Sequence, residues 1–224
     1  MLYLNFLAKN FILSEPEIKL GSSNTNEFTY SMENIEKHNL LDIEKEKPPF
    51  LYHASQNKNI EELKPQAISF RDPKEGAVVF ASPDYALVTT FLIKTDESWT
   101  QIGKNNKVPY IIINDREHFM ERDKGGTIYK LPNTSFNYDP GKGMGEYEWI
   151  SREPIKPIEK KDYGSALEAM IENGVQVYFV DKKTFDELER TEKGEDYVKL
   201  LKGLESENQK RGKNVLSFEN EDEE

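Results

Sequence analysis

The pattern of apolar and polar residues becomes regular at residue 50 and predicts a series of strands and helices up to residue 204. Short runs rich in β-branched and aromatic residues indicate strands, and apolar residues spaced three or four apart indicate helices. The predicted strands cover residues 50–55, 77–82, 109–114, 126–132, 147–151 and 175–181. Helical segments are predicted at 59–65 (one short turn), 82–92, 163–174 and 184–204, the last with a break at Gly194.

Capping residues support two of these helices. Ser82 is a suitable N-cap for the helix over 82–92, with Pro83 at its first position and Asp84 in its first turn. Gly174 is a suitable stop for the helix over 163–174. Strands outnumber helices and do not alternate regularly with them. The pattern therefore predicts an α+β fold with a mixed, mostly antiparallel sheet and flanking helices, not a doubly wound parallel sheet.

The chain divides into three parts by composition. Residues 14–49 have few apolar periods, so residues 1–47 are interpreted as an arm and linker, 48–204 as one folded domain, and 205–224 as an acidic, disordered tail. The apolar start "MLYLNFLAKNFIL" is too short to span a bilayer and predicts a short amphipathic helix packed on the domain. A membrane-surface anchor is the alternative for this segment. No transmembrane segment is predicted.

Composition removes several classes of function. The chain has no cysteine, which excludes disulfides and thiol catalysis and suits a reducing compartment, so a cytoplasmic location is expected. The net charge of −11 argues against nonspecific nucleic-acid binding, and no extended basic patch is evident. Its three histidines lie far apart, which gives no metal motif. The glycines of "GKGMG" (141–145) lack the ending of a phosphate-binding loop and predict a mobile loop.

Three segments stand in a recognisable order along the domain. "LYHAS" carries His53 on the first predicted strand, "VVFASPDYALVTTF" lies in the middle, and "EWIS" carries Glu148 on a late strand. In this order they resemble the ADP-ribosyltransferase superfamily, on the branch of diphtheria toxin and the poly(ADP-ribose) polymerases. The resemblance extends over residues 50–181. It implies a split sheet that binds NAD as cofactor.

The resemblance assigns roles to individual residues. Glu148 would grip the ribose hydroxyls and stabilise the oxocarbenium-like state formed when the nicotinamide–ribose bond breaks. His53 would hydrogen-bond a ribose of the nucleotide, and the backbone of Ala54 would hold the carboxamide. The other expected NAD contacts are Val79, Phe80, Ser82 and Tyr85.

The chain departs from the family pattern at two of these positions. Ala54 stands where the family has glycine, and Val79 stands where it has a tyrosine that stacks on nicotinamide. Valine cannot stack, so Phe80 or Tyr85 would have to replace that ring. Glu146 forms an E-x-E pair with Glu148, and such a pair positions the acceptor in the arginine-modifying branch.

Three functions follow as alternatives. The first is an NAD-binding protein that transfers ADP-ribose to an unknown acceptor, or acts in the related RNA 2′-phosphotransferase manner. The second is a catalytically inactive binding module of the same fold, and the third is an unrelated α+β interaction domain. The local patterns also allow simpler interpretations. His53 can be a structural, hydrogen-bonded residue, and residues 146–151 can be a half-exposed strand with Trp149 in the core and both glutamates in water.

Overall fold

The computed structural model describes residues 47–68, 72–192, 194–210 and 215–216. The predictions for residues 1–46 and for the end of the acidic tail lie outside the described residues. The strands are β1 (Phe50–Ser55), β2 (Ala67–Ile68), β3 (Ala77–Ala81), β4 (Thr100–Asn105), β5 (Val108–Ile113), β6 (Gly126–Pro132), β7 (Trp149–Ser151), β8 (Glu159–Tyr163), β9 (Gln176–Phe179) and β10 (Val215–Leu216). The α-helices are α3 (Tyr85–Thr89), α4 (Arg116–Arg122), α5 (Ala166–Glu172), α6 (Lys182–Arg190) and α7 (Glu195–Lys210), and the 3-10 turns are η1 (Pro73–Glu75), η2 (Thr90–Leu92) and η3 (Gly145–Tyr147).

The described strands form three small sheets. Their strand orders are β1-β6-β8, β2-β3-β7 and β10-β9-β5-β4. Every pairing between described strands is antiparallel except β5 with β9 and β9 with β10. The predicted α+β class with a mixed, mostly antiparallel arrangement is therefore confirmed.

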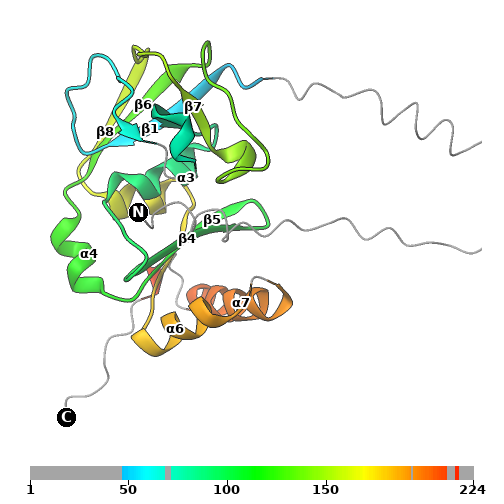
Figure 1. Ribbon diagram of the computed structural model, residues 1–224. Coiled ribbons are helices and arrows are strands. Elements are labelled where there is room, and N and C mark those ends of the chain that lie inside the picture. The colour runs from blue at the N-terminus through cyan, green and yellow to red at the C-terminus, as the bar shows by residue number, and fades with distance from the viewer. Residues whose placement is uncertain (1–46, 69–71, 193, 211–214, 217–224) are drawn as a thin grey trace, which may run out of the picture.

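The sheet that contains β4 and β5 divides the molecule into two layers. Helices α6 and α7 lie against one face, and α3 together with the other two sheets lies on the opposite side (Figure 1). Phe185 of α6 and Tyr197 of α7 are fully buried in the layer they form with the sheet. Burying a side chain as large as phenylalanine contributes about 1.5–3 kcal/mol, so this contact anchors both helices to the sheet.

Two further apolar clusters occupy the other layer. One lies where α3, η2 and α5 pack on the sheet of β5 and β9, with Leu87 and Met170 fully buried. The second lies among β1, β3, β6 and β7 and contains Leu51, Val79 and Trp149. These two clusters lie on either side of β1 and β3, and they fix the positions of the strands that carry the predicted site.

The sequence placed β1 and β6 at their observed bounds, and the predicted break at Gly194 separates α6 from α7. Helix α7 extends past Leu204, the predicted end of the domain, to Lys210. The helical turn predicted at 59–65 is wrong, because these residues form bends that end in a β-bridge at Leu63. The N-cap of α3 is Asp84 and not Ser82, since the Asp84 carboxylate accepts a hydrogen bond from Leu87 N at 2.9 Å.

Candidate functional site

Strands β1 and β3 separate immediately after a single point of contact. The backbones of Tyr52 and Ser82 exchange both of their hydrogen bonds, at 2.8 and 2.9 Å. A continuing antiparallel ladder would next join Ala54 to Phe80. Instead, the His53 side chain donates from Nδ1 to the Phe80 carbonyl oxygen at 2.7 Å. The imidazole therefore bridges the opening between the two strands and satisfies a carbonyl that the split leaves without a ladder partner.

A cavity opens at this split. It has a volume of about 650 Å³, within the range of about 300–1,000 Å³ that small-molecule and cofactor sites occupy. Its floor comes from β1 and β3, through His53, Ser55 and Phe80 among others, and its rim comes from the segment 57–66. The rim residues that line it include Asn57, Asn59, Glu61, Glu62, Lys64 and Gln66. The cavity thus combines apolar side chains, among them Val79 and Phe80, with several hydrogen-bonding groups.

The rim segment is fixed at both ends. The buried Tyr129 hydroxyl donates to the Asn57 carbonyl oxygen at 2.7 Å and accepts from Ile60 N at 3.1 Å. At the other end, the backbones of Leu63 and Ile155 exchange two hydrogen bonds of 2.8 Å. A loop tied down in this way gives a cavity that exists before any ligand arrives, and this lowers the entropic cost of binding.

The protonation state of His53 follows from its surroundings. Burial lowers its pKa below the ordinary value of 6.5, because the charged imidazolium loses its hydration. The hydrogen bond to the Phe80 carbonyl opposes this shift but is the smaller influence. At neutral pH the ring is therefore neutral, with its proton on Nδ1 and a free electron pair on Nε2. In this form Nε2 can accept a hydrogen bond from a hydroxyl of a ligand.

The carboxylate of Glu148 lies in a different local environment. Glu148 follows η3 in an extended conformation, and its residue is only 2% exposed. The loop before η3 lies directly on its side chain: a Cβ added at Gly143 would stand 2.5–2.7 Å from the carboxylate atoms. Gly143 also has a φ of +55°, a conformation that side chains rarely adopt. Glycine is therefore required at this position if the loop is to cover Glu148.

A buried lysine that the sequence did not single out contacts the residue before Glu148. Lys104 of β4 is 6% exposed and forms an ion pair with Asp84, the N-cap of α3. The Lys104 Nζ atom also stands 3.9 Å from the centroid of the Tyr147 ring, one residue before Glu148.

Strand pairing relates the segments that carry His53 and Glu148. Ala81 pairs with Trp149, so one further step of this register sets Glu148 opposite Ser82, which pairs with Tyr52. Glu148 therefore shares a face with Tyr52, whereas His53, the next residue of β1, points to the other face. The segments that carry His53 and Glu148 are adjacent across β3. Glu148 is not among the described residues that line the His53 cavity.

Of the other residues predicted to bind NAD, Val79 and Phe80 line the His53 cavity. Tyr85 lies on the other side of the split, where its ring packs edge-on against Tyr52 at 4.9 Å and its hydroxyl is 3.1 Å from that of Tyr163. Burial and this hydrogen bond raise the pKa of Tyr85 well above its ordinary value. The phenol therefore stays neutral.

The strand predicted for 147–151 is shorter than expected, and this separates the two glutamates. Glu146 lies in η3 and its carbonyl accepts from Trp149 Nε1 at 2.8 Å, so Glu146 and Glu148 do not form a same-face pair on a strand. The expectation that both glutamates lie in water is wrong for Glu148, which is buried, while Trp149 is in the core as predicted.

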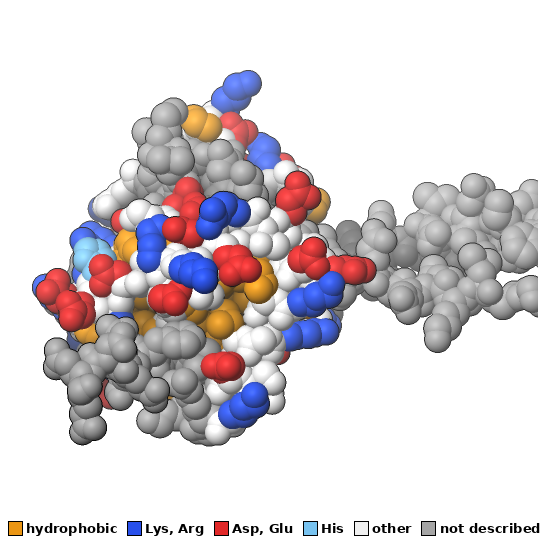
Figure 2. All heavy atoms as spheres, turned by 90° about the horizontal axis from the view of Figure 1, so that it is seen from below, with side chains coloured by type: hydrophobic (Ala, Val, Ile, Leu, Met, Phe, Trp, Pro, Cys, Tyr) orange, Lys and Arg blue, Asp and Glu red, His pale blue; other side chains and the backbone are white. Residues whose placement is uncertain are grey.

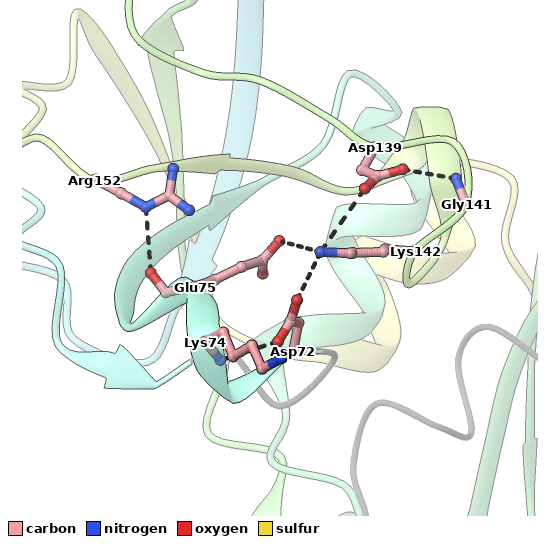
Figure 3. Close-up of polar contacts among 7 residues, drawn as sticks. All are labelled: Asp72, Lys74, Glu75, Asp139, Gly141, Lys142 and Arg152. Carbon is pink, nitrogen blue, oxygen red and sulfur yellow. Dashed lines mark hydrogen bonds and ion pairs between the residues drawn. The ribbon is translucent and has the colours of Figure 1, made fainter.

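A network of ion pairs holds the glycine loop that covers Glu148. The Lys142 ammonium lies 2.6 Å from the Asp72 carboxylate, 3.8 Å from that of Glu75 and 3.9 Å from that of Asp139 (Figure 3). Arg152 adds a hydrogen bond from Nε to the Glu75 carbonyl oxygen at 3.2 Å. These contacts tie η1 to the loop before η3, and so they fix the position of Gly143 above Glu148.

The surface seen from the α6–α7 side carries acidic and basic side chains in alternation, without an extended patch of one sign on the described part of that face (Figure 2). Within the described ranges, no helix is both long and apolar enough to cross a membrane. Comparison with protein-family models, curated proteins and solved structures gives no match to this chain. A function must therefore be proposed from the residues of the site.

Proposed function

We propose that the protein binds a nucleotide of the NAD class at the split between β1 and β3, and that it transfers ADP-ribose to an acceptor. The proposal depends chiefly on one observation, which is the opening of the two strands around His53. A neutral imidazole there has Nε2 available to accept a hydrogen bond from a ribose hydroxyl. The cavity beside it is large enough for a cofactor.

The catalytic part of this proposal depends on the resemblance, which assigns the catalytic carboxylate to Glu148. Glu148 immediately precedes β7, the strand that pairs with β3 on the edge away from β1. A carboxylate that reaches the ligand could stabilise the positive charge that develops on the ribose as nicotinamide leaves. Catalysis therefore requires the loop at Gly143 to move and the Glu148 side chain to turn toward the His53 cavity, because Glu148 is 2% exposed beneath this loop and lies outside that cavity.

A second candidate is a nucleotide-binding module without transferase activity. Two observations favour it: Val79 cannot stack on a nicotinamide ring, and the Glu148 carboxylate is covered. Binding at the His53 cavity would remain in this case, and only turnover would be lost.

Incubation with NAD labelled in the nicotinamide ring separates the candidates. For a transferase, we expect release of nicotinamide by the native protein and loss of release in Glu148→Gln, with both proteins equally folded. For a binding module, we expect an increase in melting temperature with millimolar NAD but no release. If millimolar NAD neither raises the melting temperature nor leads to release of nicotinamide, both candidates are contradicted.

A further inference from the structure

Tyr129 of β6 lies directly opposite His53 of β1. The two residues are partners in the antiparallel pairing of these strands, and opposite side chains of such a pair point to the same face of the sheet. Tyr129 is fully buried, in the apolar cluster among β1, β3, β6 and β7. His53, which lines the floor of the cavity, therefore has a buried tyrosine as its neighbour on that face.

The Tyr129 hydroxyl makes two contacts, both with the rim segment 57–66. It donates to the Asn57 carbonyl oxygen at 2.7 Å and accepts from Ile60 N at 3.1 Å. These partners lie 72 and 69 residues away along the chain, so the contacts join the rim to the sheet. One hydroxyl thus holds both ends of the stretch 57–60.

This stretch depends on side chains for its shape, because its residues belong to neither a helix nor a strand. Two contacts are local and exposed: Asn57 N donates to Ser55 Oγ at 3.1 Å, and Asn59 N donates to Asn57 Oδ1 at 3.0 Å. A third exposed contact runs from Lys160 Nζ to the Lys58 carbonyl oxygen at 2.9 Å. Water can replace an exposed hydrogen bond at little cost, whereas a buried one is costly to lose. The buried tyrosine hydroxyl is therefore the stronger restraint on the rim.

We propose that Tyr129 is a positioning residue for the ligand. Its hydroxyl holds the rim beside His53, so that the imidazole and the side-chain amides of Asn57 and Asn59, which line the same cavity, meet one ligand together. Without the hydroxyl the rim must be ordered during binding, and the apparent affinity falls with the fraction of molecules whose rim is in place. The effect on NAD binding rests on the proposed function, whereas the order of the rim can be measured without any ligand.

Hydrogen exchange at the Ile60 amide, followed by NMR, measures the order of the rim. In the native protein we expect this amide to exchange about 100-fold more slowly than in an unstructured peptide. Tyr129→Phe keeps the buried ring and removes only the hydroxyl, and it should make exchange at Ile60 about tenfold faster or more.

The matched control is Tyr197→Phe. It removes another fully buried hydroxyl, in the layer of α6 and α7 and 3.0 Å from that of Tyr110. Exchange at Ile60 should stay as in the native protein, because opening of the rim is a local event. Unprotected exchange at Ile60 in the native protein would overturn the proposal without any variant. Equal rates in the native protein and Tyr129→Phe would overturn it too.

Titration with NAD then tests the effect on the ligand. We expect Tyr129→Phe to bind NAD about fivefold to tenfold more weakly than the native protein, and Tyr197→Phe to bind it equally well. In nicotinamide release, KM should rise by the same factor with kcat almost unchanged, since the rim acts on binding and not on the chemical step. Native affinity in Tyr129→Phe would overturn the positioning role and leave the proposed function intact. If the native protein does not bind NAD, the proposed function fails, and exchange at Ile60 still decides whether Tyr129 holds the rim.

Discussion

Replacing Gly143 with alanine gives a quantitative test of how Glu148 is covered. Gly143 and Gly145 have nearly the same positive φ, +55° and +57°. An alanine costs about 1–2 kcal/mol at either position from this backbone conformation alone. At Gly143 the new Cβ would also stand 2.5 Å from Glu148 Oε1, whereas at Gly145 its nearest neighbour is Pro140 O at an ordinary 3.5 Å. Displacing a buried group in a well-packed region costs about 1–3 kcal/mol more.

We therefore expect Gly143→Ala to lower the free energy of unfolding by about 2–5 kcal/mol and Gly145→Ala by only about 1–2 kcal/mol. Urea titration followed by circular dichroism measures both, provided that the m value is unchanged. In a Glu148→Ala background the close contact is removed, and the two alanine substitutions should cost the same. Equal losses at Gly143 and Gly145 in the native background would refute the close packing of the loop on the carboxylate.

Three further predictions concern charge and hydrogen bonding. Because burial lowers the pKa of His53, the unfolded chain takes up a proton near pH 6.5 that the folded protein does not, so stability should fall as the pH drops through this value. His53→Asn, whose amide can still donate to the Phe80 carbonyl, has no imidazole to protonate. Between about pH 7.5 and 5.5 its free energy of unfolding, measured by urea titration, should therefore fall less than that of the native protein. An equal fall in the two proteins would contradict a lowered pKa for His53. Lys142→Met should lower the melting temperature slightly at neutral pH, because it removes the ion pair with Asp72. The difference from the native protein should become smaller at about 1 M salt, and also once the pH falls through the lowered pKa of Asp72. A difference that stays the same at all salt concentrations and pH values would argue against the ion pair. Tyr197→Phe removes a hydroxyl 3.0 Å from that of Tyr110 and should cost about 1–2 kcal/mol in a urea titration, whereas an unchanged midpoint would show that the pair contributes nothing. Burial raises the pKa of Tyr197 to about 12, so the native protein should also lose stability above pH 10, more than the variant does.

The sequence predicted the apolar strands well and missed those with polar composition. β1 and β6 were placed at their bounds because each is an apolar run with clear turn signals around it. β4, "TQIGKN", was not predicted, since Gln101, Lys104 and Asn105 are typical of a surface and become buried only through pairing with β5 and packing. β8, "EKKDY", was missed because it is an edge strand whose charged residues remain in water.

The candidate site was predictable only in part. Resemblance identified His53 and Glu148, and pairing of their strands with neighbouring elements set them on either side of β3. Lys104 could not be found, because its partner Asp84 lies 20 residues earlier and no spacing rule connects them. The covering of Glu148 also depends on a loop conformation, the positive φ of Gly143, that the letters "GKGMG" permit but do not specify.

The most direct test of the central claim is the affinity for NAD of the native protein and of His53→Asn, measured by titration calorimetry. Asparagine keeps a donor for the Phe80 carbonyl oxygen, but its own acceptor, Oδ1, does not extend to the position from which Nε2 would accept a hydrogen bond from the ligand. The account predicts that the native protein binds NAD and that the variant, folded to the same melting temperature without ligand, binds it about tenfold more weakly or worse. Equal affinity in the two proteins, or no binding by the native protein at millimolar NAD, would contradict it.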